Sequence, residues 1–344
     1  MNSDMQNICE QYKGHSTRKF IIIIFLVLVL MGTILVSLSM GASSVGFSDS
    51  LKALFTKTGL TSAIVWQLRL PRIVMAVLVG CALALAGSVF QALLKNPLAS
   101  PYTLGIASSA GFGAVAAIIF GGSFYGQYLI AGSAFFFSLL ASCLILGIAR
   151  IKNTTPEVMI LAGIAIMFLF SSLSSFLQYM GTVEQVHEIV FWFFGSLSKV
   201  GWQEISVAAV MILVPVPILI KWSWDFNLMA AGDESAKTLG VNVTGIRMGG
   251  IVFASLITAA GICFTGVIGF VGLVAPHIAR MIVGSDHFFL LPSSALIGGI
   301  LVLAADTLGR TCWAPQVIPL GIVTSFIGVP FYFYLLMKKK KAYW

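Results

Sequence analysis

Long runs of apolar residues alternate with short polar connections along most of this chain. The run at 20–40 is continuously apolar, and it matches the ~20 residues that a helix needs to cross a bilayer. A strand of a membrane barrel would instead alternate polar and apolar residues. The pattern therefore predicts an all-α integral membrane protein with about ten transmembrane helices. The expected spans are 20–40, 71–94, 104–120, 127–149, 156–180, 205–221, 244–266, 267–283, 290–308 and 317–337.

A polar segment at 225–243 separates the sixth and seventh spans. It must lie outside the lipid, because unpaired backbone groups cost several kcal/mol each in hydrocarbon. Asn227 or Asp233 is a candidate helix cap, and Gly240 followed by Val241 is typical of a left-handed helix stop. We expect a compact helical segment with both charge signs, which favours a docking surface for a soluble partner. The alternative is an amphipathic linker that lies on the membrane.

Composition supports this fold class and indicates an orientation. Charged residues make up 9% of the chain, against roughly 25% in an ordinary soluble domain. Of the 20 lysines and arginines, 14 fall on the side that holds 225–243 and both termini. The positive-inside rule therefore predicts a cell-membrane protein with both termini cytoplasmic, and it explains the net charge of +8 without nucleic acid. The expected organisation is a tail at 1–19, a ten-helix domain at 20–337 and a basic tail at 338–344.

The sequence contains no recognisable catalytic or metal-binding pattern. The five cysteines are scattered without a CxxC pair, and His277 is interpreted as a packed or interfacial histidine. No GxxxxGK[ST] motif is present, so any energy from ATP must come from a partner chain. An ion-coupled carrier would place ionisable residues in mid-membrane, whereas Asp306 lies near the outer end of its span. We predict no catalytic residue, no metal site and no cofactor.

One face of the fifth span is polar. Its residues recur at the helical spacing i, i+3, i+4 and i+7, so they share a side of the helix. Such a face either bonds neighbouring helices or lines a water-accessible path. The four residues are Ser171, Ser174, Ser175 and Gln178.

Three arginines are expected on the outer surface, against the positive-inside bias. Arg69 and Arg72 flank Pro71, and Arg310 follows the ninth span. Arginine forks carboxylates with two parallel hydrogen bonds, so these residues indicate an acidic partner. The alternative is that their side chains simply snorkel to the membrane interface.

Four ordered stretches resemble a single family of membrane proteins. They are LRLPRIVMAVLVGCALALAGSVFQALLKNPLASPYTLGIASSAGFGA (68–114), LMAAGDESAKTLGVNV (228–243), GFVGLVAPHIARMIVGSDHFFLLPSSALIGGILVLAADTLGR (269–310) and PLGIVTSFIGVPFYFYLL (319–336). Together they are similar to the membrane subunits of binding-protein-dependent importers for iron-siderophores, haem and vitamin B12. The resemblance covers nearly everything after residue 60.

The resemblance implies partners for each candidate surface. In that family two permeases pair around a central path, a cytoplasmic ABC ATPase docks on a coupling segment, and an extracytoplasmic binding protein docks on outer arginines. The arginines correspond to Arg69, Arg72 and Arg310, and the family's fifth and tenth spans line the path. Ala231 departs from the leucine usual before the acidic pair of the coupling segment. The coupling residues implied here are Leu228, Gly232, Asp233, Glu234, Lys237, Leu239 and Gly240.

The sequence is therefore interpreted as the permease subunit of an ATP-driven importer, with a ferric siderophore as ligand. Haem or vitamin B12 is the alternative within the same class. Two alternatives come from other classes. An ion-coupled secondary carrier acting alone predicts buried charges in the spans, and a membrane scaffold does not explain the outer arginines together with the polar segment.

Overall fold

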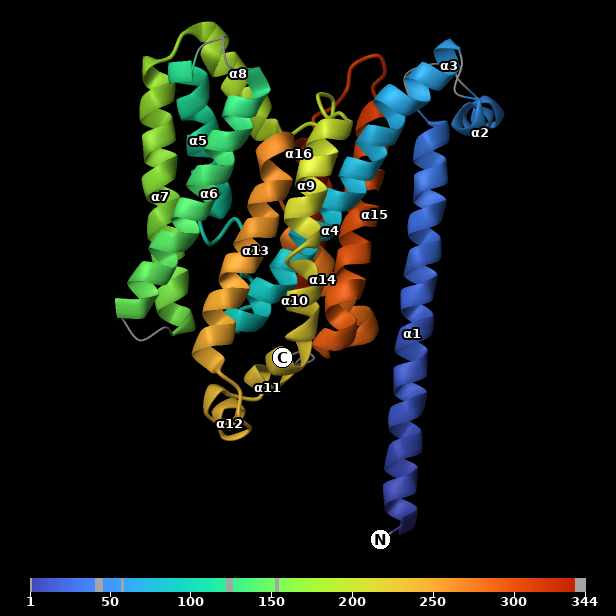
Figure 1. Ribbon diagram of the computed structural model, residues 1–344, viewed down its shortest axis with the longest axis vertical. Helices are drawn as coiled ribbons and strands as arrows, with labels where there is room; N and C mark the ends of the chain where they lie inside the picture. Colours follow the sequence, from blue (N-terminus) through green and yellow to red (C-terminus); the bar gives the residue numbers. More distant parts are fainter. Residues whose placement is uncertain (1, 41–45, 57–58, 122–125, 152–154, 338–344) are drawn as a thin grey trace.

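The computed structural model describes residues 2–40, 46–56, 59–121, 126–151 and 155–337, and all regular structure in these residues is helical (Figure 1). The basic tail at 338–344 lies outside the described residues. The elements are α1 (Asn2–Ser39), α2 (Phe47–Phe55), α3 (Leu60–Ala63), the π-helical η1 (Ile64–Arg69), α4 (Leu70–Leu94), α5 (Ile106–Gly121), α6 (Gly126–Ile151), α7 (Pro156–Met180), α8 (Val183–Phe194), α9 (Trp202–Leu213), α10 (Val216–Lys221), α11 (Ser223–Ala230), α12 (Asp233–Thr238), α13 (Val243–Thr265), α14 (Val271–Val283), α15 (His287–Thr311) and α16 (Leu320–Met337).

The predicted all-helical membrane fold is confirmed. Seven helical segments of the described residues are long and apolar enough to cross a membrane, and α5, α14 and α16 are shorter apolar helices. Each of the ten expected spans coincides with one of these segments. The short α11 and α12 lie beyond one end of the bundle, which is also the end where α1 begins (Figure 1).

Several boundaries differ from the predicted ones. The helix that contains the second span begins at Leu60 instead of near Pro71, because η1 continues the coil through the residues before the proline. Proline lacks a backbone N–H and disturbs the α-helical bonding of the preceding turn, and a π-helical turn accommodates that defect. At the amino end, α1 begins at Asn2, so the polar segment expected as a tail continues the first helix.

Helix α4 lies at the centre of the bundle, between α13 and α15 (Figure 1). Most of its residues are buried. Small residues allow it to approach its neighbours closely: Gly80 faces the backbone of Gly298 on α15, and Gly87 faces the backbone of Gly272 on α14. Helices in lipid associate through such packing, because lipid chains are as apolar as leucine and give no hydrophobic driving force. The glycines of α4 thus determine how closely the central helices pack.

We predict that Gly87→Ala destabilises the bundle. An ideal Cβ at this position overlaps the Gly272 carbonyl, and backbone cannot move aside as a flexible side chain can. Overpacking of this kind costs about 1–3 kcal/mol. Thermal unfolding in detergent measures the effect, and Gly147→Ala is the matched control, since no atom lies within 4 Å of its ideal Cβ. Equal unfolding temperatures for the two variants would contradict the central role of this contact.

Candidate functional site

The segment at 225–243 forms two short helices, α11 and α12, as expected. Gly232 precedes α12 with a φ of 133°, and Gly240 ends it with a φ of 87°. The N–H of Gly240 donates to the Lys237 carbonyl at 2.9 Å, and the N–H of Val241 donates to the Ala236 carbonyl at 3.0 Å. These two bonds are those of a Schellman stop, so the predicted left-handed end at Gly240 is confirmed.

The outer surface of α12 combines charge with one apolar side chain. Glu234 and Lys237 are exposed and form an ion pair of 2.8 Å, and Leu239 is 66% exposed. Leu228 on α11 is half-buried against the bundle. The structure thus brings the predicted coupling residues into one compact unit, and their role in coupling remains a prediction.

Neither of the two predicted caps acts as one. Gly232 occupies the N-cap of α12, and Asn227 lies inside α11, which begins at Ser223. The amide of Asn227 bonds across to the corner between α14 and α15. Its Nδ2 donates to Asp286 Oδ1 at 2.9 Å, and its Oδ1 accepts from the N–H of His287 at 2.8 Å. Asn227 therefore attaches α11 to the bundle, a role that depends on contacts distant in sequence.

Asp233 turns inward and joins α12 to α4 and α13. Its Oδ1 lies 2.8 Å from Lys95 Nζ, and its Oδ2 lies 2.8 Å from Arg247 Nη2. Partial burial opposes ionisation, but hydrogen bonds from Lys95 and Arg247 outweigh it and lower the pKa of this carboxyl below its usual 3.8. The carboxylate is therefore charged at neutral pH. Its stabilising contribution is present above pH 3.8 and is lost as the pH falls through the lowered pKa.

Two of the three arginines expected on the outer surface, Arg72 and Arg310, meet at Asp306 of α15. Arg72 and Arg310 both bond this carboxylate, with ion-pair distances of 2.8 and 2.9 Å, and the Asp306 side chain is fully buried. Arg69 donates to the Leu38 carbonyl at 2.6 Å, and Arg310 donates to the Met40 carbonyl at 3.1 Å. These carbonyls belong to the end of α1, where a helix leaves carbonyls without partners in its own backbone.

This cluster differs from the open arginine surface that the sequence suggested. Arg69 and Arg310 are buried, and only 15% of the Arg72 side chain is exposed. The carboxylate that the arginines fork comes from the chain itself, 234 residues from Arg72 in sequence. The cluster fastens α1, α4 and α15 together at the end opposite α12. A role in docking a binding protein remains a prediction.

The polar face of α7 divides into an exposed and a buried part. Ser171 and Ser175 are exposed, Gln178 is half-buried, and Ser174 is only 4% exposed. The hydroxyls of Ser174 and Ser175 donate to carbonyls one turn earlier in α7, at 2.7 and 3.0 Å. The bonds recorded for these serine hydroxyls therefore stay within their own helix. Ser171 and Ser175 present polar atoms away from the rest of the chain.

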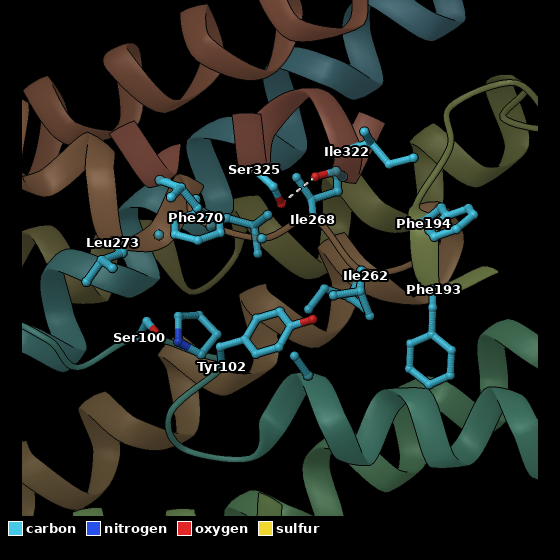
Figure 2. A pocket seen from close by; sticks show the side chains of 18 of the residues that line it. Ser100, Tyr102, Phe193, Phe194, Ile262, Ile268, Phe270, Leu273, Ile322 and Ser325 are labelled. Carbon is cyan, nitrogen blue, oxygen red and sulfur yellow. Dashed lines mark hydrogen bonds between the residues drawn. The ribbon is translucent and has the colours of Figure 1, made fainter. Parts of the chain in front are cut away.

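A pocket of about 870 Å³ opens between the turn before α5, the end of α8, the connection before α14, and α16. Figure 2 shows Tyr102 on one side and Phe270, Ile268 and Ser325 on the other. In the described part of the chain, its lining residues are mainly apolar and aromatic, and none of them is charged. Its size is within the range of pockets that hold small organic molecules.

The connection before α14 is where the sequence prediction was wrong. The eighth span was expected from 267, but α14 begins at Val271, and Gly266 and Phe270 have φ values of 71° and 66°. Residues 266–270 therefore form a non-helical wall of the pocket. The N–H of Ser196 donates to the Thr265 carbonyl at 2.7 Å, which holds the end of α8 beside this wall. Gly266 and Gly269 were the available signal, since closely spaced glycines mark breaks in helices.

His277 packs against the turn that follows α4, in agreement with its interpretation as a packed histidine. Its Nε2 lies 3.1 Å from the Pro97 carbonyl. The described residues contain no group of three or more potential ligand side chains that could hold a metal ion. The contact with Pro97 thus links α14 to the segment that leads into the pocket.

We predict that Asp306→Asn destabilises the protein by about 3–5 kcal/mol, the cost of leaving buried charges without their partner. Both Arg72 and Arg310 lose their carboxylate in this variant. Thermal unfolding in detergent gives the measurement. The control is Asp49→Asn, which removes an exposed carboxylate from the first turn of α2. A variant as stable as the parent would show that the cluster does not hold these helices together.

Cysteine labelling tests whether the exposed face of α7 contacts water. In a chain whose native cysteines are replaced by serine, we expect cysteines at Ser171 and Ser175 to react with a polar thiol reagent. Cysteines at Ser174 and Phe170, both 4% exposed, should react more slowly. Equal protection at all four positions would favour the helix-packing interpretation, because a packed interface excludes both water and reagent.

Comparison with known proteins gives the family of this chain. The model of the FecCD transport family matches residues 26–338. The protein MJ0087 of Methanocaldococcus jannaschii is 40% identical over 97% of this chain and 99% of its own length. The hemin transport system permease protein HmuU of Yersinia pestis is 36% identical over 92% of this chain and 95% of its own. A solved transporter described as inward-facing and of the metal-chelate type superposes with a TM-score of 0.82 at 32% identity, covering 92% of this chain and 99% of that one. This match along nearly the whole chain agrees with the ten-span bundle, and the chain belongs to the FecCD transport family of ABC importer permeases.

Proposed function

We propose that this permease imports a ferric siderophore, with energy supplied by a partner ATPase. Relatives in the family are named for hemin, cobalamin, Fe(3+)-citrate and molybdate. Three of these four ligands are metal ions enclosed by an organic ligand. A siderophore complex belongs to the same chemical class, and this shared chemistry supports the proposal.

The uncharged lining of the pocket is the observation that supports a metal chelate as the ligand. A bare metal cation needs oxygen or other charged ligands, and an oxyanion needs several hydrogen-bond donors or cations. The pocket offers aromatic and aliphatic surfaces with a few hydroxyls, such as those of Tyr102 and Ser325. A chelate presents its organic shell to the surroundings, and this shell complements such a surface. The volume of about 870 Å³ suits a ligand of this size class.

The remaining surfaces fit the partners of such an importer. In this proposal α11 and α12 lie in the cytoplasm, where the excess of lysine and arginine is expected, and the exposed Leu239 enters a groove of the ATPase. A second permease covers the exposed apolar side chains of α7 and α16, such as Phe176 and Phe326. A binding protein delivers the ligand at the opposite end, near the cluster around Asp306.

We predict that the reconstituted complex with its ATPase and binding protein accumulates a ferric siderophore only when ATP is supplied. Uptake of radioactive iron from a panel of single siderophores, beside hemin and cobalamin, measures this directly. Growth of a deletion strain on the same panel is the cellular counterpart. Accumulation of hemin or cobalamin alone would show that the proposed ligand is wrong and that the proposed importer class is right. Accumulation by the permease without its ATPase would instead indicate an ion-coupled carrier.

A further inference from the structure

Asp233 is the point where the short helix α12 is fastened to the transmembrane bundle. Its carboxylate accepts two charge-assisted hydrogen bonds from Arg247 Nη2, at 2.8 and 2.9 Å, and it forms an ion pair with Lys95. Arg247 is 3% exposed and also donates from Nε to the Leu93 carbonyl at 3.2 Å. Charge-assisted bonds of this kind are shorter and stronger than neutral ones. Both cations therefore connect α12 to the last turn of α4.

The segment that follows α4 leads directly from this cluster to the pocket. Lys95 ends α4 in a left-handed conformation with a φ of 46°. Residues 96–104 then form a compact turn, in which the N–H of Ser100 donates to Thr103 Oγ1 at 2.9 Å and the N–H of Leu104 donates to the Ser100 carbonyl at 3.3 Å. Ser100, Tyr102 and Thr103 line the pocket. Four residues of chain, 96–99, thus separate the ion pair at Lys95 from the first pocket-lining residue, Ser100.

A second contact connects this turn to the opposite wall of the pocket. His277 of α14 reaches the Pro97 carbonyl at 3.1 Å, and Phe270, Gly272 and Leu273 at the start of the same helix line the pocket. A displacement of the turn would therefore act on both sides of the pocket. Coupling between distant sites needs such a chain of packed and hydrogen-bonded groups.

We propose that Lys95 and Arg247 are positioning residues that clamp Asp233 to the end of α4, and that this cluster transmits movement of α12 to the pocket through residues 96–104. The inference rests on the proposed function, because it assumes that the ATPase moves α12. Glu234 and Leu239 face outward toward that partner, whereas Asp233 faces inward toward the permease itself. Glu234 and Leu239 thus receive the motion, and Asp233, at the start of α12, passes it to the bundle.

Two neutral variants with matched controls test this link. Asp233→Asn keeps the volume of the side chain and removes its charge, and Lys95→Gln removes the partner cation. Asp225→Asn on α11 and Lys221→Gln at the end of α10 remove the same charges from the same end of the bundle, outside the cluster. Lys95→Arg retains the positive charge and is the conservative rescue. The side chain of Lys95 is 35% exposed, so its replacement leaves the buried core unchanged.

Two readouts separate transmission from simple stability. The first is the amount of ferric siderophore imported per ATP hydrolysed in proteoliposomes that contain the full complex. The second is the rate at which a cysteine at Tyr102 reacts with a polar thiol reagent, with and without ATP, in the chain that lacks native cysteines. We expect Asp233→Asn and Lys95→Gln to lower both the import ratio and the ATP-dependent change in labelling by roughly two- to thirtyfold, the range of coupling energies along such networks. The controls and Lys95→Arg should retain the parent's values.

The outcomes distinguish this inference from the proposed function. If the parent complex shows no ATP-dependent import of any siderophore, the proposed function is wrong. If the parent imports a siderophore, and both neutral variants keep the parent's import per ATP hydrolysed and its ATP-dependent labelling change, the proposed role of the Asp233 cluster is overturned. Should Asp233→Asn fail to assemble with the ATPase, Lys95→Gln alone decides, and a normal ratio in that variant overturns the proposal.

Discussion

The close approach of α4 to α14 and α15 is the constraint on which the rest of this structure depends. Gly80 and Gly87 allow backbone to meet backbone where any larger side chain would separate the helices. The same helix runs through the centre of the bundle (Figure 1) and reaches a charged cluster at each end. Arg72 near one end contacts the Asp306 cluster, and Lys95 at the other end contacts the Asp233 cluster.

One cluster of ion pairs at each end of the bundle has the same composition. At each end one carboxylate accepts from two cations, Asp306 from Arg72 and Arg310, and Asp233 from Lys95 and Arg247. A charge in the middle of a bilayer is costly, whereas a paired charge near the membrane surface is tolerated. The pocket between the two clusters is lined without charge. This distribution supports the proposed bulky organic ligand over a coupling ion.

Relatives with different named ligands share one family, so the fold alone does not select the ligand. In the proposed function, the permease's part in ligand selection falls to the side chains that line the pocket, among them Tyr102 and Phe270. Both residues lie outside regular helices, in connections held by hydrogen bonds to neighbouring elements. Functional residues often occupy such connections, because a rigid scaffold positions them while the helices supply stability.

The sequence by itself determined the features that depend on local pattern. Continuous apolar runs predicted the ten spans, since the length of a membrane helix follows from the thickness of the bilayer. The stop at Gly240 was also predictable, because it involves residues only a few positions apart. The quoted motifs were sufficient to indicate the family.

The tertiary structure alone decided where the polar side chains point. Asp306 meets Arg72 across 234 residues of chain, and Ser174 is buried while Ser175 is exposed, although both belong to one predicted polar face. The inward turn of Asp233 and the pocket wall at 266–270 likewise depend on how distant helices pack. Helical periodicity assigns a residue to a side of its own helix, but it does not say which neighbour covers that side. That choice is made by the packing of backbone and side chains in three dimensions.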